Sequence, residues 1–244
     1  MGIIDIHGHI WMNHIHEDVA AMVSASQKYG IEKILISPLG THRPNKEEIR
    51  LLNREANCVC KANPLFARYV TVAPEHDNAL SILETGVIDG AVGMKMWVSC
   101  LADDNVCDPL YEYCAQLDIP VLVHTFAKSV GQLSFESTAV NLANAAKRHV
   151  NTKFIMAHLG GNCYHGIPVV STLKNVYLDF SGSNCRADDL MYTLDYVPID
   201  RILFGTDMPG SFIMTYGQVL GAGLTEEQVA RICRENALTL FSRL

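Results

Sequence analysis

The chain has 244 residues, of which 49% are hydrophobic and 18% are charged, with a formal net charge of −7 at pH 7. This composition is typical of a compact globular protein and argues against long disordered tails. Because Lys and Arg are few and scattered, nucleic acid and anionic membranes are disfavoured as partners, and we expect a small-molecule substrate. No apolar run approaches the roughly 20 residues of a membrane span. The eight cysteines contain no C-x-x-C pair, so we expect reduced thiols. The start of the chain lacks a signal-peptide pattern, so we expect a cytoplasmic location.

Short β-rich runs alternate with helical segments along the whole chain. The expected strands are, in order, 3–7, 33–37, 67–72, 90–98, 120–124, 153–158, 175–180 and 201–205. Helical spacing is found between them, notably in 16–30, 45–63 and 136–149, and the chain closes with an expected helix at 224–241. Apolar strands that are each followed by a helix are typical of a parallel sheet covered on its outside. Eight such units without a composition break predict one α/β domain over residues 1–244, a (β/α)8 TIM barrel, with an open doubly wound sheet as the alternative.

Titratable side chains lie at the ends of several expected strands. His7 and His9 end the first strand, His124 ends the fifth, His158 ends the sixth, and Asp207 follows the eighth. In a barrel of this kind the C-terminal ends of the strands meet around one active site. Residues scattered over two hundred positions are therefore expected to converge.

The residue types at these strand ends indicate a metal site. Imidazole nitrogens and carboxylate oxygens are the ligands that divalent metals take in catalytic sites, with a position left for water. His7 and His9 supply two ligands from one strand, and Asp207 could supply a third. We expect one or two divalent ions, with zinc as the first choice and manganese, iron or cobalt as alternatives. Lys95 lies inside the fourth strand, in an apolar run where an unpaired lysine is rarely tolerated.

Three polar residues near the first strand are interpreted differently. In a regular strand Asp5 shares the face of His7 and His9, so we expect it to orient an imidazole or to pair with a neighbouring strand. His14 and His16 repeat the H-x-H spacing but fall in the following loop. Since a loop does not by itself hold two imidazoles rigidly, we do not expect them to bind metal.

Four residues on the same rim are candidates for substrate binding. Trp97 follows Lys95 by two positions and is expected either to form a wall of the pocket or to pack within the barrel. Arg186 is a candidate cationic clamp for an acid substrate, or else a surface residue paired with one of the aspartates that follow it. His42 and Tyr164 lie in loops after the second and sixth strands and are weaker candidates.

Several motifs together resemble a known family. These are IIDIHGH, GMKMW, PVLVHT, FIMAHLGGN, NVYLDFSG, RILFGTDMP and ENALTLF, which span nearly the whole chain in this order. The chain resembles the amidohydrolase superfamily, and within it the amidohydrolase-2 branch of TIM-barrel metal-dependent hydrolases. This resemblance implies that His7, His9 and Asp207 bind a metal, that His124 is a further ligand, and that His158 is a ligand or an acid/base near the substrate.

The resemblance also bears on Lys95, which in binuclear members is carboxylated and bridges two metals. TatD-type nucleases look similar at their H-x-H motif, but they place a glutamate on the fourth strand where this chain has Lys95. The nuclease interpretation is therefore disfavoured.

These observations predict a metal-dependent hydrolase of an ester, lactone or amide bond in a small metabolite. A bound cation lowers the pKa of its water from about 15.7 toward about 7, Asp207 would move the proton, and His158 would stabilise the oxyanion or donate the proton. A first alternative is a non-oxidative decarboxylase of an aromatic or unsaturated acid, since the branch contains such enzymes. A second is a barrel that binds metal or ligand without catalysis. A homodimer is expected because symmetric dimers are common among soluble enzymes.

Overall fold

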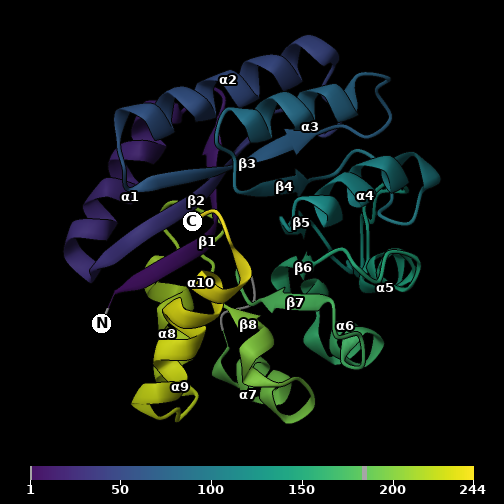
Figure 1. The fold of residues 1–244 in the computed structure, drawn as a ribbon. Helices are drawn as coiled ribbons and strands as arrows, with labels where there is room; N and C mark the ends of the chain where they lie inside the picture. The colour runs from purple at the N-terminus through teal and green to yellow at the C-terminus, as the bar shows by residue number, and fades with distance from the viewer. Residues whose placement is uncertain (1, 183–185) are drawn as a thin grey trace.

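The computed structural model describes residues 2–182 and 186–244, and these form a barrel of eight parallel strands surrounded by helices (Figure 1). The strands are β1 (Ile3–Trp11), β2 (Ile31–Leu39), β3 (Phe66–Val72), β4 (Gly93–Met96), β5 (Val121–Val123), β6 (Phe154–Met156), β7 (Val176–Asp179) and β8 (Ile202–Leu203). Each strand pairs with the next in sequence. The first and last strands are joined by backbone hydrogen bonds, in which the Ile6 amide donates to the Phe204 carbonyl (2.9 Å) and the Asp207 amide to the His7 carbonyl (2.6 Å). The predicted (β/α)8 barrel is thus confirmed.

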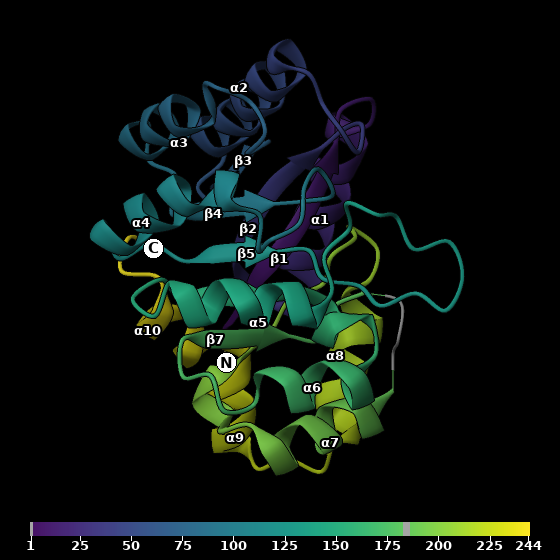
Figure 2. The ribbon, with the colours of Figure 1, turned by 90° about the vertical axis from the view of Figure 1, so that its right-hand side faces the viewer.

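The helices cover the outside of the barrel, as two perpendicular views show (Figures 1 and 2). They are α1 (Ile15–Tyr29), α2 (Lys46–Ala62), α3 (Ala79–Ile88), α4 (Asp108–Gln116), α5 (Ala139–Arg148), α6 (Cys163–Val170), α7 (Ala187–Tyr196), α8 (Phe212–Gly221), α9 (Glu226–Ala230) and α10 (Asn236–Leu240). Short 3-10 turns lie at Asn105–Cys107, Ala157–Gly161 and Ile199–Arg201, and a π-helical turn lies at Arg231–Glu235. Within the described part of the chain, no helix is long and apolar enough to cross a membrane.

Local sequence accounts for the helix boundaries, with two departures from expectation. Asn45 caps α2, because its side chain accepts hydrogen bonds from the amides of Glu47 and Glu48. The helix expected from residue 136 begins only at Ala139, since Thr138 forms a capping box there. The helix expected at 224–241 contains the π-helical turn between α9 and α10, a local insertion that helical periodicity does not reveal.

The barrel interior is apolar at its base and polar toward the C-terminal ends of the strands. The inward-facing apolar cluster is Ile4, Ile6, Leu35, Tyr69, Leu122, Ile155 and Leu203, closed by Leu240 and Phe241 from the end of the chain. On β4, Met94 and Met96 pack outward against the helices. Lys95 therefore points inward, where it is fully buried.

A β-bulge in β1 changes which of its side chains face the interior. Between Asp5 and Gly8 the strand advances three residues while β2 advances two, from Ile34 to Ile36. Ile6 and His7 consequently both contact residues of the interior. The prediction that Asp5, His7 and His9 share one face is therefore wrong for Asp5.

Asp5 stabilises the bulge and joins it to the end of β8. Its carboxylate accepts hydrogen bonds from the His7 amide (3.1 Å) and from the amide and hydroxyl of Thr206 (3.0 and 2.6 Å). The Ile6 carbonyl accepts from the Tyr69 hydroxyl across the barrel at 2.7 Å. Of the two expected roles of Asp5, the structure shows pairing with a neighbouring strand.

Candidate metal centre

His7, His9 and Asp207 bring three ligand atoms together at the C-terminal end of the barrel. His7 and His9 lie on β1, and Asp207 follows β8 in a left-handed conformation with φ of 71°. His7 Nε2 and His9 Nε2 are 3.0 Å apart, and Asp207 Oδ1 lies 3.6 and 3.2 Å from them. With metal–ligand bonds of about 2.1 Å, neighbouring ligand atoms around one ion are roughly 3.0 to 3.4 Å apart. The separations of 3.0 and 3.2 Å fall in this range and the separation of 3.6 Å is slightly longer, so the three atoms are close to the spacing that one ion requires.

The hydrogen-bond partners of the two imidazoles determine which ring nitrogens face this centre with a lone pair. His7 Nδ1 lies 2.9 Å from Asp179 Oδ2, and His9 Nδ1 lies 3.0 Å from the Ser37 carbonyl oxygen. Because a carboxylate and a carbonyl only accept, each Nδ1 carries the ring proton and each Nε2 is an acceptor. Two lone pairs and the Asp207 carboxylate thus converge on one point, an arrangement that calls for a cation.

The burial of these groups favours neutral, metal-ready imidazoles. His7 is fully buried and His9 is 2% exposed. Burial, together with the nearby charge of Lys95, lowers the pKa of His7 to about 3, and burial also lowers the pKa of His9. Since the neutral imidazole is the form that binds metal, neither ring needs to lose a proton near pH 7.

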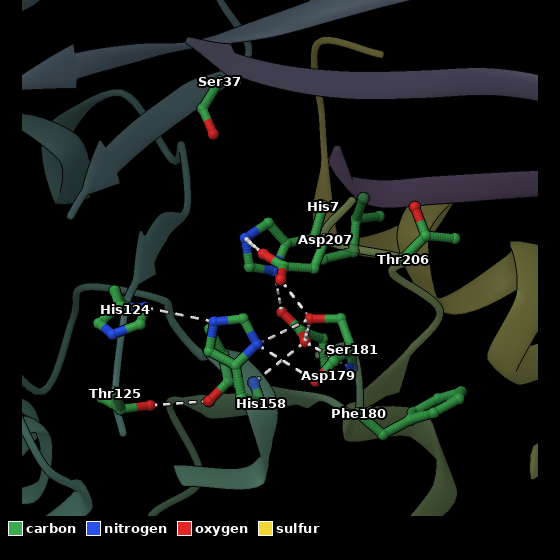
Figure 3. Close-up of polar contacts among 12 residues, drawn as sticks. His7, Ser37, His124, Thr125, His158, Asp179, Phe180, Ser181, Thr206 and Asp207 are labelled. Carbon is green, nitrogen blue, oxygen red and sulfur yellow. Dashed lines mark hydrogen bonds and ion pairs between the residues drawn. The ribbon is translucent and has the colours of Figure 1, made fainter. Parts of the chain in front are cut away.

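Asp179 and Ser181, which the sequence analysis did not single out, orient the site from below (Figure 3). Asp179 is fully buried at the end of β7 and accepts from His7 Nδ1, from the amides of His158 and Ser181, and from the Ser181 hydroxyl. Burial opposes its ionisation, but the contact with His7 and the Ser181 hydrogen bond outweigh this and hold the pKa of Asp179 well below its usual range. Asp179 could have been recognised from the sequence, because it is an aspartate at an inward-facing position of β7 within NVYLDFSG. His7, His158 and Asp179 also form a compact group, but His7 and Asp179 are already hydrogen-bonded to each other.

His158 lies beside the metal centre in a strained segment of backbone. It has φ of 60°, and Leu159 follows with φ of 49°; such left-handed conformations of non-glycine residues often mark functional sites. His158 Nδ1 lies 3.2 Å from the Ser181 carbonyl oxygen, so this nitrogen carries the proton and Nε2 is an acceptor. His158 Nε2 lies 3.3 Å from His124 Nδ1. His158 is thereby held next to the three ligand atoms, and within the described residues no carboxylate is hydrogen-bonded to its Nε2.

Lys95 contacts the metal centre directly. Its Nζ lies 2.9 Å from His7 Nε2, and burial lowers the pKa of Lys95 to about 8. An amine near its pKa at neutral pH is a reactive nucleophile as well as a cation. Lys95 lies on the fourth strand as expected, and its carboxylation stays a prediction.

The expected substrate-binding residues fall into two groups. Trp97 and His42 lie together at the mouth, with ring centroids 4.9 Å apart, and Trp11 of β1 contacts Trp97 at 6.0 Å. Arg186 is bound to Asp189 of α7 at 2.8 Å and lies near the Tyr164 ring. The surface pairing considered for Arg186 is therefore what the structure shows.

Tyr164 packs on Tyr192 of α7, with ring centroids 4.6 Å apart. His14 and His16 are exposed, and within the described residues neither belongs to a group that could hold an ion.

A cavity of about 570 Å³ adjoins His158 through Phe126, whose ring centroid is 5.8 Å from that of His158. Lys128, Asn162 and His165 also line it. This volume is in the range of small-molecule sites, and none of these lining residues was expected from the sequence.

The amidohydrolase sequence profile matches residues 4–243. The chain belongs to the amidohydrolase family. No curated protein sequence matches this family member.

Solved structures similar to this amidohydrolase share its fold. One is 2,6-dihydroxybenzoate decarboxylase complexed with 2,6-dihydroxybenzoate, at 18% identity and a TM-score of 0.81, covering 99% of each chain. Another is a dihydroxybenzoic acid decarboxylase from a Polaromonas species with manganese and 2-nitroresorcinol, at 20% identity and 0.78, covering 99% of this chain and 97% of that one. A third is 5-carboxyvanillate decarboxylase from Novosphingobium aromaticivorans with manganese and a nitrobenzoic acid, at 13% identity and 0.76, covering 98% and 96%.

Proposed function

We propose that the protein is a metal-dependent, non-oxidative decarboxylase of an aromatic or unsaturated carboxylic acid. The observation that carries the proposal is the convergence of His7 Nε2, His9 Nε2 and Asp207 Oδ1 on one point, with His158 beside it and outside the set. One cation and one separate acid/base are what such a reaction needs. The structurally similar decarboxylases, two of them with manganese, support this choice over hydrolysis. Two imidazoles and a carboxylate suit both zinc and manganese.

The atoms and electrons that move in a decarboxylation determine what the protein must supply. The carboxylate leaves as carbon dioxide, the electron pair of the broken carbon–carbon bond stays on the substrate carbon, and that carbon takes one proton. When bound, a divalent cation holds the acid's oxygens and withdraws electron density from the substrate. No water is consumed, so the protein must supply and recover a single proton.

His158 is suited to carry this proton at Nε2. Its Nδ1–H is held by the Ser181 carbonyl oxygen, which orients the ring. The buried Asp179 anion accepts from the His158 amide and from Ser181, and so favours a positive charge on the nearby imidazole during proton transfer. Asp207 faces His7 and His9, and we assign it to cation binding and to relaying protons from solvent.

The proposed function is tested by assaying the protein, loaded with zinc or manganese, against a panel of hydroxybenzoic and unsaturated carboxylic acids in deuterated water. We expect carbon dioxide release and a product that carries deuterium at the carbon that lost the carboxylate. The panel also contains aryl esters and lactones. Hydrolysis of these without any decarboxylation would contradict the proposal.

Metal binding is also expected to stabilise the fold, because the ligand set of His7, His9 and Asp207 is assembled only in the folded chain and a ligand that binds only the folded state opposes unfolding. At a free metal concentration 100 times the Kd, the stabilisation is about 2.7 kcal/mol. For a chain of this size this corresponds to a rise in Tm of roughly 5 to 10 °C. Thermal unfolding with added zinc or manganese, reversed by a chelator, measures it. An unchanged Tm at saturating metal would argue against the site.

Hydrolysis remains a second candidate because of Lys95. Its Nζ lies against His7 Nε2 in full burial, the position at which a carboxylated lysine would add an anion and allow a second metal. A second metal would favour an activated-water mechanism on an ester, lactone or amide.

Native mass spectrometry with elemental analysis distinguishes the two candidates. A single-metal decarboxylase is expected to show about one metal per chain and an unmodified Lys95. Two metals with about 44 Da of added mass, the weight of carbon dioxide on lysine, would instead support the hydrolase. Lys95→Arg, which cannot be carboxylated in this way, is the matched control for the added mass.

A further inference from the structure

Glu136 is a buried acid between β5 and α5 to which the proposed mechanism assigns no role. Its side chain is only 2% exposed. Oε1 lies 3.0 Å from His124 Nε2, whereas Oε2 lies 2.7 Å from Lys128 Nζ and 3.2 Å from Gln132 Nε2. Each carboxylate oxygen therefore has a different kind of partner, one in the candidate site and one in the loop.

The contact with Glu136 determines the tautomer of His124. An ionised carboxylate only accepts, so His124 Nε2 carries the ring proton and Nδ1 keeps its lone pair. This Nδ1 is the atom that lies 3.3 Å from His158 Nε2 (Figure 3), and His124 lies outside the three-atom set of His7, His9 and Asp207.

We propose that Glu136 is a positioning residue, which holds His124 as the Nε2–H tautomer and so presents its Nδ1 lone pair to the cation. The inference rests on the proposed metal site. A carboxylate behind a ligating imidazole fixes the orientation of the ring and raises its basicity, and loss of such a partner weakens metal binding by about 10- to 100-fold.

The surroundings of Oε2 make Glu136→Gln a specific probe of the His124 tautomer. Among the residues that the structure describes, the hydrogen-bond partners of Oε2 are all donors, namely Lys128 Nζ, Gln132 Nε2 and the Leu133 amide at 3.5 Å. The amide group of a glutamine cannot donate to these donors, so its carbonyl oxygen must occupy the Oε2 position. Its NH2 group then faces His124 Nε2 and donates to it, which moves the ring proton to Nδ1. The substitution is therefore expected to invert the tautomer of His124.

The matched control is Lys128→Met. It removes the ion pair of Glu136 within the loop and leaves the contact between Glu136 Oε1 and His124 Nε2 in place. If Glu136 acted only by holding the loop together, both variants would have similar effects.

The test is long-range proton–nitrogen NMR of isotope-labelled, metal-free protein, with His124 assigned from a His124→Gln variant, followed by calorimetric titration with zinc. We expect the Nε2–H tautomer in the wild type and in Lys128→Met, and the Nδ1–H tautomer in Glu136→Gln. Zinc affinity should fall about 10- to 100-fold in Glu136→Gln and much less in Lys128→Met.

Three results would overturn the inference: the Nδ1–H tautomer in the wild type, an unchanged tautomer in Glu136→Gln, or equal losses of zinc affinity in the two variants. The wild-type spectrum tests the inference by itself, even if the Glu136→Gln protein does not fold. A wild-type protein that shows the expected tautomer but binds no zinc would refute the proposed metal site and leave the orientation of His124 by Glu136 intact.

Discussion

Asp207→Asn is expected to lose both the metal and the activity. Asp207 Oδ1 is the anionic member of the three-atom set, lying 3.2 Å from His9 Nε2 and 3.6 Å from His7 Nε2. Asparagine keeps an oxygen but removes the charge, so we expect metal affinity to fall by at least about 100-fold. Loss of the cation removes several kcal/mol of transition-state stabilisation, or roughly 10³-fold in kcat/KM.

The substitution suits this position because asparagine tolerates the left-handed backbone that Asp207 adopts with φ of 71°. The backbone hydrogen bond from residue 207 to the His7 carbonyl oxygen should also persist. Metal content per chain and steady-state rates measure the effect, with the exposed Asp195→Asn on α7 as the control. An Asp207→Asn protein that retains one tightly bound metal would show that Asp207 is not a ligand.

His158→Asn is expected to separate metal binding from chemistry. Since His158 lies outside the three-atom set, the metal content should stay near that of the wild type. Loss of the proton donor should lower kcat by about 10²- to 10⁴-fold. Asparagine again fits the left-handed backbone, and its amide can still donate to the Ser181 carbonyl oxygen.

A second readout does not depend on turnover of the acid. Because the proton step is reversible, the wild type should also exchange the hydrogen of the product at the reacting carbon with deuterium from solvent, and His158→Asn should not. If both kcat and this exchange are unchanged in a metal-loaded His158→Asn protein, then Asp207 rather than His158 is the donor.

Much of the barrel could be predicted from the sequence because burial is encoded locally. The strands on the barrel wall are buried on both faces, so runs such as those around β5 and β6 are apolar almost throughout. The inward position of Lys95 and the convergence of His7, His9, His158 and Asp207 follow from strand alternation and from the rule that strand ends meet at one mouth.

The sequence by itself therefore determined the fold and the residues that end its strands. Only the tertiary structure decided how those residues are held: by Asp179, 172 positions from His7, by Glu136 behind His124, and by the bulge that turns Asp5 toward Thr206. These contacts join segments that closure of the barrel brings together, and periodicity carries no information about which partner lies across the ring. For the same reason, the ion pair between Arg186 and Asp189 could be identified only from the position of α7 in the structure.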